Sequence, residues 1–122
     1  MFLRESGRKH GLDINLEALV RPELDSGVPG GPELLEFAEA VIGPDRARLD
    51  AARNTLAEKL SRATVTGASA IAGNFSKNDR IADAIGIPIE PSDLQPTKAM
   101  RAQLGLNDFK SAANTFRHFR DD

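Results

Sequence analysis

Residues 61–86 of the chain read SRATVTGASAIAGNFSKNDRIADAIG, and this stretch decides the expected fold. Ser61 or Thr64 can cap the start of a helix here, and Gly86 can end it. Glycines and alanines in the stretch would let a neighbouring helix approach closely. Apolar side chains recur at steps of three and four residues, interrupted at Asp79, which is the spacing of one helix face: Val65, Ala68, Ala72, Phe75, Ala82 and Ile85. The stretch therefore predicts a central, largely buried helix.

The rest of the chain predicts further helices on both sides of this stretch. Residues 25–32 are rich in Gly and Pro and predict a loop, whereas residues 87–96 contain three prolines and predict an extended crossing. No segment predicts a strand, so we expect an all-α fold of five to six helices in a single domain, residues 1–122. Capping residues, glycine stops and helical spacing mark additional helices at residues 32–42, 45–60, 97–104 and 107–119 and a short one at residues 13–20, while residues 2–10 are polar and helix-compatible.

The composition supports helices and excludes several kinds of chemistry. Alanine accounts for 17 of the 122 residues, and the only aromatic side chains besides histidine are six Phe, which argues against an all-β fold. The absence of cysteine excludes disulfides, thiolate nucleophiles and dithiol redox cycles within this chain. Two histidines, His10 and His118, are too few for a His-rich metal site.

Charge and hydropathy indicate which partners to expect. A formal net charge of −2 lacks the basic excess that attracts nucleic acids or anionic membranes, so we expect neither as a partner. No apolar run is long enough for a signal peptide or a membrane span, and the default expectation is a cytoplasmic protein. No motif calls for a cofactor.

The two predicted helices that flank Gly43 and Pro44 raise the alternative of a helix-turn-helix DNA binder. Arg46, Arg48 and Arg53 would then contact phosphates. Acidic residues share that helix and reduce its basic character: Asp45, Asp50 and Glu58. Such a binder would have a salt-dependent affinity for DNA.

His10 and Glu39 are the candidates for acid–base chemistry. His10 would need a carboxylate to orient it as a general base, and the alternative is a histidine placed at a helix C-terminus by the helix dipole. Glu39 follows Glu33 and Glu36 at steps of three, but no His follows at the spacing of a di-metal site, which favours a solvated acidic face. A cofactor-free enzyme would use His10 with Glu39 or Arg80.

A polar cluster, made of Asn74, Asn78, Arg80 and Asp83, lies on the predicted central helix. Asn74 and Asn78 are four residues apart and share a face, while Arg80 and Asp83 are three apart and can pair. One interpretation is that the cluster lines a cavity or an oligomer interface. The other is a set of buried hydrogen bonds that cap neighbouring helices, together with one solvated ion pair.

Residues 74–88, NFSKNDRIADAIGIP, resemble the closing stretch of the AhpD-like, or carboxymuconolactone decarboxylase-like, superfamily. Members often carry there a pattern close to F-N-x-x-N-R-x-A-D-x-x-G-(I/V)-P. Asp79 departs from the pattern because it separates the Asn and Arg that usually adjoin. The helix at residues 33–41, ELLEFAEAV, is similar to the L-x-F-A-E-A-V helix of the family. The matching positions of the closing stretch are Phe75, Asn78, Arg80, Ala82, Asp83, Gly86 and Pro88.

The resemblance spans residues 12–115 and implies an AhpD-like helical bundle that is incomplete relative to the family. Residues 87–122 would form a C-terminal extension, and family members usually assemble as trimers or hexamers. Peroxidase members use Cys-x-x-Cys with a nearby His and Glu, and this chain has no cysteine to carry that chemistry. Residues 2–13 look like the segment that follows the family's motif, which would place the catalytic helix upstream of Met1.

Three functional hypotheses follow, beside the DNA-binding alternative. The first is a non-catalytic, self-associating helical protein of this superfamily. The second is the C-terminal part of an alkylhydroperoxidase-like antioxidant enzyme whose Cys-x-x-Cys helix lies upstream or in a partner. The third is a cofactor-free enzyme of the decarboxylase type. Because a bundle that lacks a core helix leaves an apolar groove, we expect a homo-oligomer or a helical partner subunit.

Overall fold

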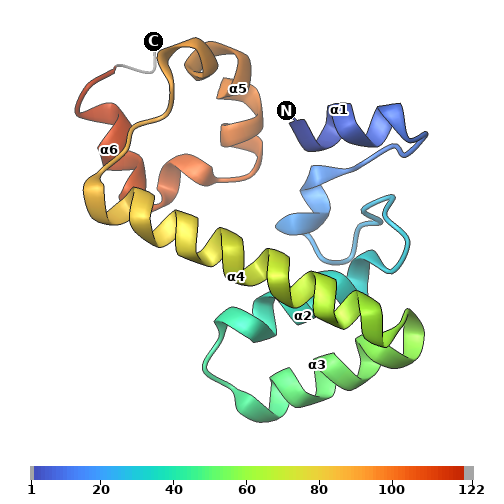
Figure 1. The fold of residues 1–122 in the computed structure, drawn as a ribbon. Coiled ribbons are helices and arrows are strands. Elements are labelled where there is room, and N and C mark those ends of the chain that lie inside the picture. Colours follow the sequence, from blue (N-terminus) through green and yellow to red (C-terminus); the bar gives the residue numbers. More distant parts are fainter. Residues whose placement is uncertain (1, 120–122) are drawn as a thin grey trace. The chain divides into compact units, whose positions relative to one another are not determined.

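The computed structural model describes residues 2–119, except for the side chains of residues 2–5. Every regular element in this part of the chain is helical, which confirms the all-α prediction of five to six helices. Three short 3₁₀ turns accompany the α-helices: η1 (Leu16–Leu19), η2 (Leu106–Asp108) and η3 (Lys110–Ala112). The α-helices are α1 (Phe2–Lys9), α2 (Gly31–Ile42), α3 (Arg46–Lys59), α4 (Arg62–Ile85), α5 (Pro91–Gln103) and α6 (Ala113–Phe116) (Figure 1).

The chain divides into two compact units, Phe2–Lys77 and the residues from Asn78 onward. The division falls inside α4. It therefore lies ahead of residue 87, the residue at which the resemblance predicts that a C-terminal extension begins. Each unit has its own buried side chains. These are mainly Ile14, Ala18, Phe37, Ala40, Ala52 and Leu56 in the first unit, and Leu94, Thr97, Arg101 and Leu104 in the second.

An antiparallel hairpin of α2 and α3 forms the centre of the first unit (Figure 1). Pro32 stands in the first turn of α2, where its missing N–H costs no hydrogen bond. The Gly43–Pro44 pair ends α2. Asp45 then caps α3, because its carboxylate accepts a hydrogen bond from the backbone N–H of Arg48 at 3.0 Å. The connection is therefore short and keeps the two helices side by side.

The core of the hairpin is a small apolar cluster in which Leu56 is fully buried and Phe37 is 2% exposed. Ala40 and Ala52 belong to the same cluster, and their small side chains let the two helices approach closely. Half-buried residues complete the packing: Leu34 and Val41 from α2, Leu49 from α3, and Val65 and Ala68 from α4.

The segment before the hairpin is ordered by local hydrogen bonds. Asn15 caps η1 by accepting a hydrogen bond from the N–H of Glu17 at 3.0 Å, and its own N–H donates to the carbonyl of Ser26. Gly27 closes this loop with a φ of +72°, and a side chain there would collide with the carbonyl oxygen of Asp13. Ile14 is buried as a result.

Helix α4 has the predicted bounds but not the predicted burial. Ser61 caps it, since its hydroxyl accepts a hydrogen bond from the N–H of Thr64 at 3.0 Å, and Gly86 ends it with a φ of +70°. The prediction of a largely buried helix is wrong, because α4 contains no buried residue. Val65 and Ala68 pack on the hairpin core, but Phe75 and Ile85 are exposed even though the predicted core face includes them.

The second unit departs further from the prediction. Helix α5 begins at Pro91, within the predicted extended crossing, because Pro91 occupies the first turn and Pro96 is tolerated inside the helix. Leu94 on α5 and Leu104, the residue that follows the helix, are both buried. The predicted continuous helix from residue 107 onward is wrong. Phe109 adopts an extended backbone, with φ −70° and ψ 144°, and breaks the segment into η2, η3 and α6.

Hydropathy along the described helices is too low, or the helices too short, for any of them to cross a lipid bilayer.

The fully buried position of Leu56 generates a stability prediction. Replacing Leu56 with Ala should lower the free energy of unfolding by about 2–5 kcal/mol, because it leaves a cavity in the core that α2 and α3 share. The matched control is Ile42→Ala on α2, where the side chain is 68% exposed and the loss should stay below about 1 kcal/mol. Chemical denaturation followed by circular dichroism measures both, and equal losses would contradict the described packing.

Candidate functional site

An arginine–glutamate network lies on the outer side of the α2–α3 hairpin. The guanidinium of Arg48 donates to both carboxylate oxygens of Glu36, with Nε–Oε1 and Nη2–Oε2 distances of 2.7 Å each. The same Nη2 donates to Oε2 of Glu39 at 2.8 Å. This paired, charge-assisted geometry holds the acidic side of α2 against α3. Glu36 and Glu39 are exposed, as the sequence favours, but both are paired with this arginine, and Glu33 is half-buried.

These contacts perturb the titration of the carboxyl groups involved. The hydrogen bonds from Arg48 lower the pKa of Glu36 below its ordinary value. A hydrogen bond from Arg53 is the main reason that the pKa of Asp50 is also lowered, and Arg46 adds a second attraction. A carboxyl group whose pKa is lowered by folding stabilises the folded state at pH values above its ordinary pKa. This stabilisation is lost as the pH falls through the pKa of the folded state.

The three arginines of the DNA-binding alternative all have carboxylate partners in the structure. Arg46 and Arg53 both pair with Asp50, and Arg48 pairs with Glu36 and Glu39. A phosphate would have to compete with these carboxylates. The expectation that nucleic acid is not a partner remains a prediction.

The acid–base candidates are not joined in the structure. His10 is exposed after the end of α1, and its backbone N–H donates to the carbonyl of Gly7. Glu39 is paired with Arg48. Within the described part of the chain, no hydrogen bond or ion pair links His10 to Glu39, so an enzyme built on this pair gains no support from the geometry.

All four members of the polar cluster are exposed on α4. The interpretation of buried, helix-capping hydrogen bonds is therefore wrong. Asn74 accepts a hydrogen bond from Nζ of Lys77 on its side-chain oxygen at 3.1 Å. Asp83 accepts one from the Asn114 amide at 3.5 Å, and together with Asp79 it lines a pocket. Asn78 and Arg80 are not among the residues that line this pocket.

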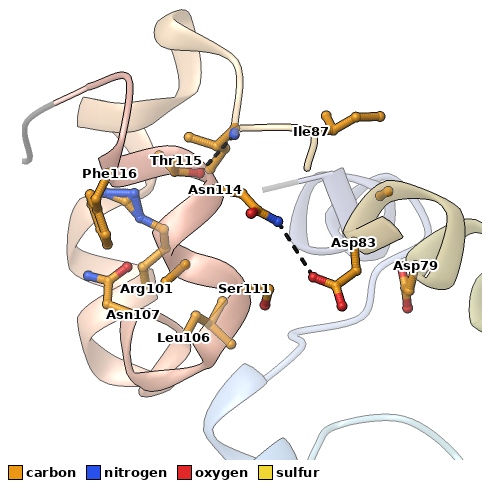
Figure 2. A pocket seen from close by; sticks show the side chains of 13 residues that line it. Asp79, Asp83, Ile87, Arg101, Leu106, Asn107, Ser111, Asn114, Thr115 and Phe116 are labelled. Atoms are coloured by element: carbon orange, nitrogen blue, oxygen red, sulfur yellow. Dashed lines mark hydrogen bonds between the residues drawn. The ribbon is translucent and has the colours of Figure 1, made fainter. Parts of the chain in front are cut away.

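The pocket lies within the second unit and has a volume of about 480 Å³ (Figure 2). The polar part of its wall includes Asp79 and Asp83 on one side and Ser111 and Asn114 on the other (Figure 2). The apolar part of the wall is made of Ala82, Ile87, Ile89, Leu106, Ala112 and Phe116. The volume falls within the range of small-molecule sites, and the wall mixes apolar and polar groups as such sites do.

Two polar side chains fix the frame of this pocket. Thr115 accepts a hydrogen bond from the backbone N–H of Ile89 at 3.0 Å and so ties the extended segment after α4 to α6 (Figure 2). Arg101 is only 5% exposed, and its Nη2 donates to the carbonyl of Leu94 at 3.1 Å. Neither histidine is among the lining residues, so Ser111 has no imidazole base beside it there.

A second surface of interest is the exposed apolar side of α4, here named the α4 apolar face. Its large members are Ile71, Phe75, Ile81 and Ile85, with exposed fractions of 62%, 61%, 52% and 68%. The predicted apolar series includes Phe75 and Ile85 but omits Ile71 and Ile81, which lie further around the helix. The signal that finds them is the same helical spacing, rotated around the helix.

No group of three or more His, Asp or Glu side chains in the described residues could hold a metal ion.

Comparison with known proteins adds no relative. No family model, no curated protein and no solved structure matches this chain. The resemblance of residues 74–88 to the AhpD-like superfamily therefore stays a prediction. The surfaces and side chains described above are what indicates the function of the protein.

The Arg48 network generates a prediction about pH. In Arg48→Ala, the pKa of Glu36, followed by NMR of its side-chain carboxyl carbon, should rise back toward the ordinary value of 4.5, because the hydrogen bonds that lower it are gone. The loss of stability on acidification below that value should also become smaller. Arg46→Ala is the matched control, since Arg46 contacts Asp50 instead of Glu36. A Glu36 titration that Arg48→Ala leaves unchanged would refute the network.

Proposed function

We propose that this chain is a non-catalytic helical protein that self-associates through the α4 apolar face. The observation that supports it most directly is that α4, the longest described helix at 24 residues, buries none of them while four large apolar side chains stay exposed. Exposed apolar side chains gathered on one element are typical of protein–protein contact surfaces. A second copy of the chain would remove them from water.

Gly67 gives independent support. A side chain built at Gly67 would meet no atom within 4 Å, and its φ is negative, so neither space nor backbone conformation requires glycine there. A helix-interior glycine costs about 0.5–1 kcal/mol relative to alanine. Gly67 lies one helical turn before Ile71, on the α4 apolar face. Close approach of a second helix is a physical reason for a glycine at that position.

The rest of the proposal concerns chemistry and ancestry. The acid–base candidates His10 and Glu39 are not linked, and the chain has no thiol, which supports a role in binding rather than in catalysis. Membership of the AhpD-like superfamily is part of the proposal and rests on the motif in residues 74–88. Assembly into oligomers is the usual behaviour of that family and agrees with the proposed role.

The decisive experiment is a mass measurement in solution. Sedimentation equilibrium in the micromolar range should give a mass that exceeds 13.2 kDa and rises with concentration. The double variant Ile71→Ser/Phe75→Ser should be monomeric, because it removes the apolar contact. Ile42→Ser is the matched control, since Ile42 is 68% exposed on α2 and lies off the α4 apolar face. A monomeric native protein throughout the series would overturn the proposal, and so would equal dissociation by the control.

Gly67 and Gly73 of α4, at which an added side chain would meet no other atom, provide a second prediction. Gly67→Ala and Gly73→Ala should each stabilise the monomer by about 0.5–1 kcal/mol, because alanine favours the helix and its side chain enters free space. Only Gly67→Ala should weaken association, since Gly73 points to the other side of α4 by helical geometry. Thermal unfolding under dilute conditions and sedimentation measure the two effects separately. Equal association constants for the two variants would contradict the assigned face.

A further inference from the structure

The α4 apolar face contains a regular heptad series. Residues 67, 71, 74, 78, 81 and 85 are separated by alternating steps of four and three, which is the repeat of a coiled-coil seam. All six are exposed. The series lies on one continuous helix, and its members are Gly67, Ile71, Asn74, Asn78, Ile81 and Ile85.

This series is close to symmetrical about residue 76. Asn74 and Asn78 lie at equal sequence distances on either side of residue 76. Ile71 and Ile81 form the next pair outward, again at equal sequence distances. The outermost pair is Gly67 and Ile85. A seam of this kind is self-complementary when the helix meets a reversed copy of itself, because a two-fold axis makes each residue meet its counterpart twice.

We propose that α4 pairs with α4 of a second copy in an antiparallel two-fold arrangement centred near Ser76. This inference rests on the proposed function and adds its geometry. Each Ile71 packs against Ile81 of the second copy, and each Asn74 faces Asn78 of the second copy. The partner that the surface fits is therefore this chain itself.

Side-chain volume favours the antiparallel direction over the parallel one. In a parallel pair Gly67 would meet Gly67 and Ile85 would meet Ile85, which leaves a gap at one end and two bulky side chains at the other. In the antiparallel pair Ile85 fills the space above Gly67 at both ends. Since interfaces pack to nearly the density of protein interiors, the antiparallel direction is the better fit.

The asparagines supply direction and register. The side-chain oxygen of Asn74 accepts from Lys77 within the same helix, so its amide NH₂ can donate to the side-chain oxygen of Asn78 in the second copy. The symmetry forms this contact twice. A polar pair inside an otherwise apolar seam costs stability but penalises every register that leaves it unpaired.

Small side chains flank the ends of the seam on one side, where Ala70 and Ala84 are exposed. Between them, beside the centre, stands the exposed Lys77, whose ammonium group donates to Asn74 of the same helix. Phe75 lies next to the centre on the other side, so that the two copies of Phe75 come together beside the axis. Aromatic pairs of this kind add to the energy of apolar burial.

Disulfide trapping tests the direction, because the native chain has no cysteine. Ile71→Cys and Ile81→Cys chains, mixed and mildly oxidised, should form a mixed disulfide dimer, while each variant alone should cross-link at least about tenfold less. In the antiparallel pair two copies of residue 71 lie about 15 Å apart along the axis, beyond the roughly 7 Å limit for a disulfide. Parallel pairing would instead cross-link each variant with itself, and that result overturns the inference.

Charge substitutions at the asparagines provide a second test. Asn74→Asp/Asn78→Lys in one chain should keep association within about tenfold of the native protein, because opposite charges then face each other twice. Asn74→Asp/Asn78→Asp should abolish it through repulsion between like charges. Circular dichroism checks that both variants fold. Association of the double-aspartate variant as strong as that of the first variant overturns the inference.

The outcomes separate this inference from the proposed function. A monomeric native protein refutes both. An oligomer in which the Ile71→Cys or the Ile81→Cys variant cross-links with itself, or in which neither variant forms a disulfide, refutes the antiparallel pairing and leaves self-association standing.

Discussion

The packing of α2 against α3 is the contact on which the first unit depends. Leu56 and Phe37 lose nearly all contact with water there, and this is possible because Ala40 and Ala52 keep the two helices close. The bridge from Arg48 to Glu36 and Glu39 joins the same helices on their outer side. Apolar burial supplies the main driving force, while the ion pairs add a preferred register at an exposed and therefore weakly stabilising position.

The local signals in the sequence predicted the helices well. Asp45, Ser61 and Gly86 occupy the ends at which the sequence places them, because capping depends on a few adjacent residues. Where prediction failed, a local signal had two possible meanings. Pro91 indicates a loop by composition but fits the first turn of a helix equally well, and an extended backbone at Phe109 has no marker in the sequence.

The burial of α4 could not be predicted, because periodicity identifies an apolar face without saying what covers it. Val65 and Ala68 pack on the hairpin core, whereas Phe75 stays exposed although it lies on nearly the same side of the helix, about two turns after Ala68. Ile71 is exposed as well. For the polar cluster, too, the sequence predicts which residues share a face but not what they contact. That Asn74 and Asn78 share a face follows from helical spacing alone, but the contact of Asp83 with Asn114 joins residues far apart in the sequence and needs the fold. The same holds for most of the pocket in the second unit.

The exposure of α4 also bears on how its backbone opens. Its amide hydrogens are protected by intrahelical bonds and by a narrow strip of packing around Val65 and Ala68, with no buried side chain to anchor its middle turns. Such a helix opens locally at a free-energy cost well below that of unfolding the hairpin core. Hydrogen exchange in the isolated chain should then be fast around Gly73 and slow around Leu56, so that α4 acquires its rigidity from whatever covers it.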